Sequence, residues 1–218
     1  MADAKIVLAS HNKGKLKELR EILRGRIDGL DVDTQVVDAS SVNAPDVPET
    51  GVTFAENSLL KARAVAEATG LIAIADDSGL SVDVLNGAPG IFSARWAGRH
   101  CDDSANMNLL LAQLSDISAE RRGAKFCCAA SVASPNGFEA VEYGELPGEL
   151  LTAPAGEGGF GYDPILRPVE LNGENALYEG QYAGKSCAEI PAEIKNSISH
   201  RARAFEALIP QIAAALTS

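Results

Sequence analysis

The sequence predicts an α/β protein, because short apolar runs alternate with stretches of helical periodicity. Residues 5–9 form the first apolar run, and a polar loop separates them from Leu16, Leu19, Ile22 and Leu23, which repeat at helical spacing. A second apolar run, residues 71–75, follows a helical segment and stops at two adjacent carboxylates. In open α/β sheets, ligands bind beyond the carboxyl ends of strands, so both loops are candidate sites.

Length and charge exclude several classes of function. The chain has 218 residues, which fits one domain and leaves room for two lobes. Its formal net charge is −11, whereas general nucleic-acid and membrane-surface binders need a basic footprint. Without a signal peptide or a long apolar run, we expect a soluble cytoplasmic protein. The four cysteines (Cys101, Cys127, Cys128 and Cys187) lack metal-ligand spacing, so we expect free thiols.

The first loop, residues 10–15, has the composition of a phosphate-binding turn between a strand and a helix. Its backbone N–H groups and the helix N-terminus can face a phosphate, and lysines add positive charge. It is not a Walker A loop, because it has one glycine and no Gly-Lys-[Ser/Thr] ending. A plain N-capped helix with solvated lysines is the alternative.

The next helix is predicted to begin at a capping box, Thr53 and Glu56, and to end at Gly70. The segment before it, residues 25–48, is rich in loops and contains one expected strand near residues 34–37. On the helix, Asn57 and Lys61 are four residues apart and share one face, where they could simply be solvated. Glu49 lies in the preceding loop, which could approach the two carboxylates.

Those carboxylates, Asp76 and Asp77, end the predicted strand of residues 71–75. Hard oxygen ligands of this kind suit Mg²⁺, which keeps several waters for a phosphate partner. On a regular strand the two side chains point to opposite faces, so one could face the ion while the other braces the turn. The alternative is an Asx turn at the end of the strand.

The C-terminal half is predicted to contain more strands and helices. Asp102 or Asp103 can cap a helix, and residues 124–134 and 138–143 read as a hairpin with its turn at residues 135–137. Pro147 and Gly148 are expected to interrupt the second strand, and residues 171–188 read as an irregular loop. A helical turn begins near residues 190–193.

The last helix carries an apolar stripe and is expected to be capped by Ser199 and kinked or divided at Pro210. His200 and Arg201 would occupy its first turn, where the helix dipole disfavours cations. A local anion or carbonyl partner is therefore expected, and a solvated basic face is the alternative.

A glycine-rich stretch, residues 156–164, is another candidate ligand-binding region. Its glycines let the backbone approach a ligand closely, and Phe160 and Tyr162 could stack on a planar base, a contact worth roughly 1–3 kcal/mol. A glycine-rich turn with its aromatic rings in the core is the alternative.

Taken together, seven segments resemble the inosine/xanthosine triphosphate pyrophosphatases, which hydrolyse non-standard purine nucleoside triphosphates. They occur in unbroken order over nearly the whole chain, at residues 10–15, 49–57, 61–63, 75–80, 87–95, 158–164 and 198–201. His11, Lys13 and Trp96 occupy positions that these motifs leave variable.

The resemblance implies a fold and a reaction. The fold is α/β, with a long mixed β-sheet with flanking helices and two lobes around a central substrate cleft. It forms a single pyrophosphatase domain over residues 1–218 and a homodimer. Water attacks the α-phosphate of ITP, dITP or XTP and releases the monophosphate and pyrophosphate, which removes these nucleotides from the pool. Mg²⁺ is required.

The resemblance also implies residue roles. Asp77 is the general base, with Asp76 beside it and Lys15 as a further catalytic residue, and Glu49 and Asp77 hold Mg²⁺. The substrate-binding set consists of Ser10, His11, Asn12, Lys13, Gly14, Lys15, Lys61, Ser78, Phe160, Gly161, Tyr162, Asp163, Lys195, His200 and Arg201. Within this set Ser10, Asn12 and Lys15 grip the triphosphate, Lys61 reaches a phosphate, and Ser78 contacts the substrate. Residues 160–163 line the nucleoside pocket, and Lys195, His200 and Arg201 recognise the purine.

The chemistry agrees with these roles. Phosphoryl transfer needs positioning and charge neutralisation, which carboxylate-bound Mg²⁺ and lysines supply. Lysine and arginine only donate hydrogen bonds, so they favour a 6-keto purine over adenine, although this does not reject GTP. A pyrophosphatase for other altered nucleotides and a nucleotide-binding regulator without turnover are the alternatives. The acids Glu49, Asp76 and Asp77 argue against a regulator without turnover. A protein that only binds an anion gains nothing from acids near the phosphate unless a metal ion bridges the two.

Overall fold

The computed structural model describes residues 4–100, 102–171, 174–175 and 180–217. The chain forms two compact units. Unit 1 comprises Met1–Asp77, Cys128–Gly144 and Arg201–Ser218, and unit 2 comprises Ser78–Cys127 and Glu145–His200. In the described part of the chain, no helix combines the length and the apolar character needed to cross a membrane.

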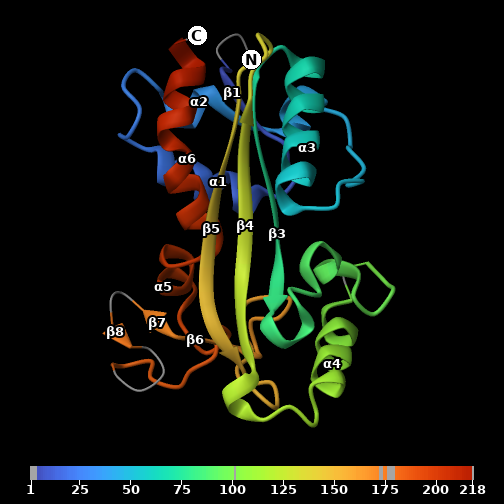
Figure 1. Ribbon diagram of the computed structural model, residues 1–218. Helices are drawn as coiled ribbons and strands as arrows, with labels where there is room; N and C mark the ends of the chain where they lie inside the picture. Colours follow the sequence, from blue (N-terminus) through green and yellow to red (C-terminus); the bar gives the residue numbers. More distant parts are fainter. Residues whose placement is uncertain (1–3, 101, 172–173, 176–179, 218) are drawn as a thin grey trace. The chain divides into compact units, whose positions relative to one another are not determined.

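The predicted α/β class and mixed sheet are confirmed (Figure 1). The main sheet has the strand order β2-β1-β3-β4-β5-β6. Strand β1 (Ile6–Leu8) pairs in parallel with β2 (Val36–Asp38) and with β3 (Ile72–Val82). At the other end of the order, β5 (Glu139–Leu150) pairs antiparallel with β6 (Leu166–Pro168). Strand β4 (Gly123–Ala133) lies between β3 and β5.

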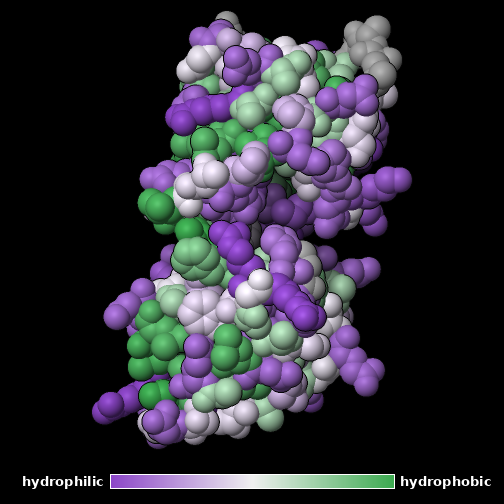
Figure 2. Space-filling view, turned by 90° about the vertical axis from the view of Figure 1, so that its right-hand side faces the viewer, coloured by the Kyte–Doolittle hydropathy of each residue, from purple (hydrophilic) through white to green (hydrophobic). Residues whose placement is uncertain are grey.

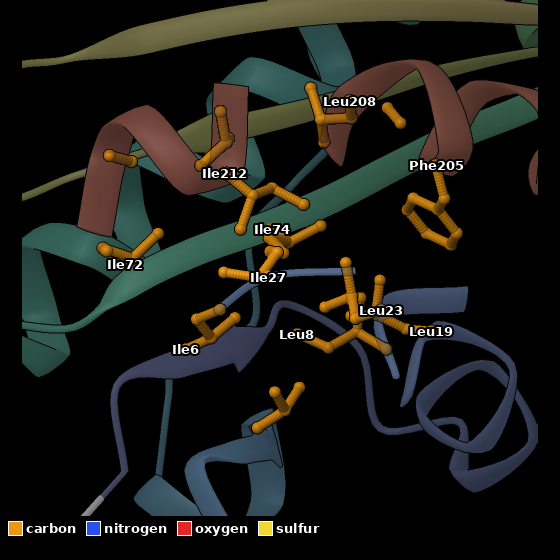
Figure 3. Close-up of a cluster of buried hydrophobic side chains, with 14 of the residues drawn as sticks. Ile6, Leu8, Leu19, Leu23, Ile27, Ile72, Ile74, Phe205, Leu208 and Ile212 are labelled. Carbon is orange, nitrogen blue, oxygen red and sulfur yellow. The ribbon is translucent and has the colours of Figure 1, made fainter. Parts of the chain in front are cut away.

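In unit 1, successive side chains of β1 and β3 point alternately into two separate hydrophobic clusters. Ile6 and Ile74 belong to a cluster with α1 (Lys13–Leu23) and α6 (His200–Thr217), whose buried side chains Figure 3 shows. Their sequence neighbours Val7 and Ala73 belong to a second cluster with α3 (Phe54–Thr69). Because successive strand residues point to opposite faces, α3 and α6 cover opposite faces of these strands (Figure 1).

The rest of unit 1 consists of short elements. A one-turn helix, α2 (Val32–Gln35), precedes β2, and the 3₁₀ helix η1 (Ala39–Val42) follows it. The expected strand near residues 34–37 therefore begins at residue 36 and ends at residue 38. The predicted start and end of α3 are confirmed, since Thr53 Oγ1 accepts from the Glu56 N–H and Gly70 adopts a left-handed φ of 68°.

In unit 2, α4 (Asp103–Gln113) and α5 (Ala192–Ser197) pack on the parts of β3, β4 and β5 that belong to this unit. Its core includes Leu80, Leu110, Phe126, Leu146 and Tyr162. Asp102 caps α4, as predicted. The smaller elements are η2 (Asp83–Leu85), η3 (Gly90–Arg95), η4 (Ala119–Arg121), β7 (Glu170–Leu171) and β8 (Glu174–Asn175). The expected loop of residues 171–188 thus includes part of a short hairpin, and residues 172–173 and 176–179 lie outside the described chain.

Two predictions about where strands end are wrong. Strand β3 does not stop at Asp76 and Asp77 but continues to Val82, because neighbouring cations and hydrogen bonds satisfy both carboxylates. Strand β5 runs through Pro147, whose carbonyl still accepts from the Val169 N–H, and through Gly148, where a Cβ would lie 2.5 Å from the Arg167 carbonyl.

Helix α6 is likewise not divided at Pro210. Pro210 and Glu206, the residue whose carbonyl loses its donor, both lie on the exposed side of the helix. Water can therefore satisfy the carbonyl that proline leaves without a partner in the helix.

Polar side chains predominate on the face seen in Figure 2, with apolar ones interspersed among them. The large exposed apolar side chains include Tyr143 in unit 1 and Phe160 in unit 2.

Cys127, Cys128 and Cys187 form no disulfide, as predicted, and Cys101 lies outside the described residues.

Candidate active site

The loop of residues 10–15 forms a capped helix start. The Asn12 side chain accepts hydrogen bonds from the N–H groups of Gly14 (2.8 Å) and Lys15 (3.3 Å). Ser10 Oγ in turn accepts from the Asn12 N–H. The N-capped interpretation of this loop is therefore confirmed, while Lys13 lies exposed at the first position of α1.

His11 connects this loop to the segment after β2. Its ring nitrogens lie 3.0 Å from Ser40 Oγ and 2.9 Å from Asp46 Oδ1, at an exposed position. The side chain therefore braces the loop from outside.

Lys15 is not solvated but points to β3. Its Nζ donates to both carboxylate oxygens of Asp76, at 2.9 Å each, and Arg201 Nε donates to the same carboxylate at 3.2 Å. Arg201 also forms an ion pair with Glu18 at 3.5 Å. The expected anionic partner of this first-turn arginine is thus present, and the solvated alternative is wrong for Arg201.

Asp76 is buried and remains ionised. Burial by itself raises the pKa of a carboxyl, but the charges of Lys15 and Arg201 and the hydrogen bond from Lys15 outweigh it. The pKa of Asp76 therefore lies far below its usual range. Burial likewise disfavours the charged form of Arg201, yet Asp76 and Glu18 raise its pKa above the ordinary value.

The Asp77 side chain lies on the other side of β3, the side that faces α3. Asn57 Nδ2 donates to Asp77 Oδ2 at 3.0 Å. One turn later, Lys61 Nζ donates to Glu49 Oε1 at 2.6 Å and to the Asp76 carbonyl at 2.7 Å. Asn57 and Lys61 are therefore not solvated, and the Asx-turn alternative for the two acids is wrong. One helix face holds both the Glu49 loop and the strand.

This donor set fits Mg²⁺. Glu49 and Asp77 offer hard carboxylate oxygens on one face of α3, and the Glu49 carboxylate already accepts a cationic ammonium. Mg²⁺ characteristically uses one or two carboxylates and fills its other positions with water and substrate phosphates. Within the described residues, no group of three or more His, Cys, Asp or Glu side chains is arranged to hold a metal ion.

In unit 2 the glycine-rich loop is organised by Asp163, which is buried. Asp163 Oδ2 accepts from the Phe160 N–H and from Lys195 Nζ, at 3.0 Å each. The Lys195 ammonium also lies 4.8 Å from the centroid of the Phe160 ring. Gly159, with a φ of +73°, leaves no room for a Cβ beside the Asp163 carboxylate.

The two aromatic residues of this loop have different environments. Phe160 is 61% exposed, so its ring can accept a stacked base. Tyr162 is buried and donates from its hydroxyl to the Ser93 carbonyl at 2.9 Å. The core interpretation is therefore right for Tyr162 and wrong for Phe160. The adjoining Gly161 N–H donates to Asp103 at 2.8 Å.

The other two predicted substrate residues of unit 2 are His200, at the start of α6, and Ser78, within β3. The His200 ring is buried and stacks on Phe126, with centroids 5.1 Å apart. Ser78 follows Asp77 on β3 and is half-buried.

Sequence reasoning missed several residues that complete these clusters. Glu18 and Asp103 bind predicted site residues, and Ser58 and Ser131 form a buried hydroxyl pair at 2.7 Å between α3 and β4. Glu18 lies three residues after Lys15 on α1, which is a usable signal. The others meet partners far away in the chain, and no local pattern reveals them.

Comparison with known proteins decides the family. The model of the Ham1 family matches residues 6–211. The chain belongs to the Ham1 family. A relative in Streptomyces coelicolor, named dITP/XTP pyrophosphatase, is 60% identical over 208 residues, which cover 95% of this chain and 96% of the relative. A protein of the same name from Bifidobacterium animalis subsp. lactis is 46% identical, over 95% of this chain and 96% of its own.

Solved Ham1 structures share the fold. A HAM1 protein from Coxiella burnetii superposes with a TM-score of 0.81 at 36% identity, over 97% of this chain and 99% of its own. The nucleoside-triphosphatase / dITP/XTP pyrophosphatase from Mycobacterium abscessus gives a TM-score of 0.73 at 46% identity, over 94% of this chain and 99% of its own.

Proposed function

We propose that this chain hydrolyses dITP, XTP and ITP to the nucleoside monophosphate and pyrophosphate, and so removes them from the nucleotide pool. The observation that carries the proposal is the cluster around β3, in a chain that is 60% identical to a dITP/XTP pyrophosphatase over 95% of its length. The cluster joins carboxylates suited to Mg²⁺ with lysines suited to phosphates. The enzyme is a hydrolase of the nucleoside triphosphate pyrophosphatase class.

On the phosphate side, lysines neutralise charge. Asp76 holds the Lys15 ammonium at 2.9 Å, and the Asp76 carbonyl together with Glu49 holds that of Lys61. Both ammonium groups are therefore positioned before substrate arrives, which lowers the cost of ordering them during the reaction. Ser10 and Asn12, the N-cap residue, lie immediately before α1. The N-terminus of a helix favours anions.

Glu49 and Asp77 would hold Mg²⁺. When bound, the ion supplies charge neutralisation at the phosphates and lowers the pKa of a bound water. Asp77 is the carboxylate that we assign to accept a proton from the attacking water. Asp76 is not, because its very low pKa and its two cationic partners keep it ionised. Asp76 instead acts by positioning Lys15.

On the base side, donors select the purine. The exposed Phe160 ring offers a stacking face, and Lys195 beside it donates hydrogen bonds only. A 6-keto oxygen accepts such a bond, whereas the amino group of adenine does not. Contacts of His200 and Arg201 with the base remain predictions, and the structure engages Arg201 with Asp76 and Glu18.

A nucleotide panel tests the proposal. Purified protein with Mg²⁺ is incubated with ITP, dITP, XTP, GTP, ATP and dUTP, and pyrophosphate release is followed. Fast release from the first three, with slow release from GTP and ATP, is the expected result. Preferential hydrolysis of dUTP would favour a pyrophosphatase for other altered nucleotides, and no turnover with Mg²⁺ or Mn²⁺ would favour a binding protein. The homodimer, the cytoplasmic location and the single domain over residues 1–218 also remain predictions.

A further inference from the structure

We infer that Asn57 is a positioning residue that ties the Glu49 loop to the carboxylate of Asp77. In this way one buried side chain holds the two carboxylates proposed for Mg²⁺ in a fixed relation. The inference rests on the proposed function, since it concerns the ion that this function uses.

Both halves of the Asn57 carboxamide are engaged. Oδ1 accepts from the Gly51 N–H at 2.8 Å, and Nδ2 donates to Asp77 Oδ2 at 3.0 Å. Asn57 is 1% exposed, so water competes little with either bond. A carboxylate at this position would keep the acceptor but lose the donor, and alanine would lose both.

The Glu49 loop is closely fitted to the start of α3. A Cβ on Gly51 would lie 2.6 Å from Glu56 Cβ and 2.8 Å from Asn57 Oδ1, so only glycine fits there without displacement. The neighbouring Val52 N–H donates to Glu56 Oε2 at 2.6 Å. The loop that carries Glu49 therefore has a defined path against the helix, and Asn57 is its anchor to the strand.

The frame beneath Asn57 is also fixed. The next residue, Ser58, is buried and donates from its hydroxyl to the Ala75 carbonyl at 3.1 Å, immediately before the two acids. Its Oγ also lies 2.7 Å from that of Ser131 on β4. These bonds hold α3 against two strands. The Asp77 carboxylate therefore takes its hydrogen bond from a helix that is itself bonded to two strands.

Groups that orient metal ligands commonly affect affinity without touching the metal. Their loss typically weakens metal binding by about 10–100-fold. Asn57 orients Asp77 directly and the Glu49 segment through Gly51, so its loss removes both constraints at once. We therefore expect the intrinsic affinity for a divalent cation to depend on Asn57 even when no nucleotide is present.

The test measures Mn²⁺ binding without nucleotide, by electron paramagnetic resonance of the free ion. Mn²⁺ is chosen because it shares the preference of Mg²⁺ for oxygen ligands. Asn57→Ala is expected to weaken binding by about tenfold or more, and to speed hydrogen exchange of the Gly51 amide. The matched control is Val65→Ala on the same helix, which removes a buried side chain of the α3 cluster and leaves both Asn57 bonds intact. Its Mn²⁺ affinity should stay within about twofold of wild type, since Val65 belongs to an apolar cluster that includes neither Glu49 nor Asp77.

Gly51→Ala is the second variant, and it keeps the inference testable if Asn57→Ala fails to fold. It disturbs the same link from the loop side and is expected to weaken Mn²⁺ binding as well. If folded Asn57→Ala or Gly51→Ala binds Mn²⁺ as wild type does, or if Val65→Ala weakens binding equally, the inference is overturned. Nucleotide turnover of the wild-type protein is measured on the same preparation. Turnover with unchanged Mn²⁺ binding in the variants overturns the role of Asn57 alone, whereas lack of wild-type turnover overturns the proposed function.

Discussion

The Lys15 ammonium donates to both carboxylate oxygens of Asp76, at 2.9 Å each, from α1 to β3. Arg201 completes the arrangement from α6. The buried carboxylate of β3 thus connects α1 and α6. Along the chain, Asp76 is 61 residues from Lys15 and 125 residues from Arg201. The same contact that packs these elements together also presents the lysine proposed to bind phosphate.

Replacing this carboxylate should destabilise the protein strongly. Asp76→Asn removes the charge but keeps the shape, and it leaves Lys15 without its carboxylate partner and Arg201 with Glu18 alone, in a largely buried setting. Breaking a buried pair in this way costs about 3–5 kcal/mol in the free energy of unfolding. Urea denaturation measures it. Asp33→Asn is the control, because Asp33 pairs with Arg24 at an exposed position and should cost only about 0–1 kcal/mol. Equal losses in both variants would contradict the anchoring role of Asp76.

The same carboxylate should make stability depend on pH in the acid range. The pKa of Asp76 is lower in the folded protein than its ordinary value of about 3.9 in an unfolded chain. Its contribution is therefore complete above the unfolded pKa and is lost as the pH falls toward the folded pKa. Between about pH 5 and pH 3, wild-type stability should fall more steeply than that of Asp76→Asn, by up to about 1.4 kcal/mol per pH unit. Urea midpoints across this range provide the measurement, and parallel profiles would refute the assignment.

Phe160 should affect substrate binding and not stability. Its ring is 61% exposed, so Phe160→Ala removes a stacking surface and little core. Losing about 1–3 kcal/mol of stacking raises KM for XTP by roughly 5–150-fold. Tyr143→Ala is the matched control, since Tyr143 is 63% exposed but lies in unit 1 on β5. If KM changes equally in both variants, the stacking face lies elsewhere.

Much of unit 1 could be predicted from its local sequence. An N-capped start of α1 and the start of α3 at Thr53 follow from side chains that bond to nearby backbone, and the end of α3 at Gly70 follows from the left-handed φ that glycine adopts readily. The continuation of β3 through Asp76 could not be predicted, because the cations that permit it come from α1 and α6. Local propensity predicts a turn there, and tertiary contacts override it.

The candidate site shows the same division. Residue types and motif order predicted a set of acids and lysines, and the structure pairs Lys15 with Asp76 and Lys61 with Glu49. The sharing of a helix face by Asn57 and Lys61 followed from their spacing. The partners of those side chains depend on contacts between distant segments. Asp103, for example, binds the Gly161 N–H across 58 residues, and nothing near either residue in the sequence indicates it.

Asp77 should be needed for catalysis but not for folding. Asp77→Asn keeps a side chain of the same size beside Asn57, yet it is neither a proton acceptor nor an anionic ligand. We expect the rate of pyrophosphate release to fall by at least about 10²-fold, with the urea midpoint near that of wild type. Asp116→Asn, at an exposed position outside the proposed site, controls for loss of one charge. A wild-type rate in Asp77→Asn would remove Asp77 from the mechanism.

The position of bond cleavage tests the central claim most directly. XTP is hydrolysed with Mg²⁺ in water enriched in ¹⁸O, and the products are resolved by ³¹P nuclear magnetic resonance and mass spectrometry. Attack of water on the α-phosphate predicts xanthosine monophosphate that carries ¹⁸O, together with unlabelled pyrophosphate. Formation of the diphosphate and labelled inorganic phosphate would contradict the proposed pyrophosphatase reaction.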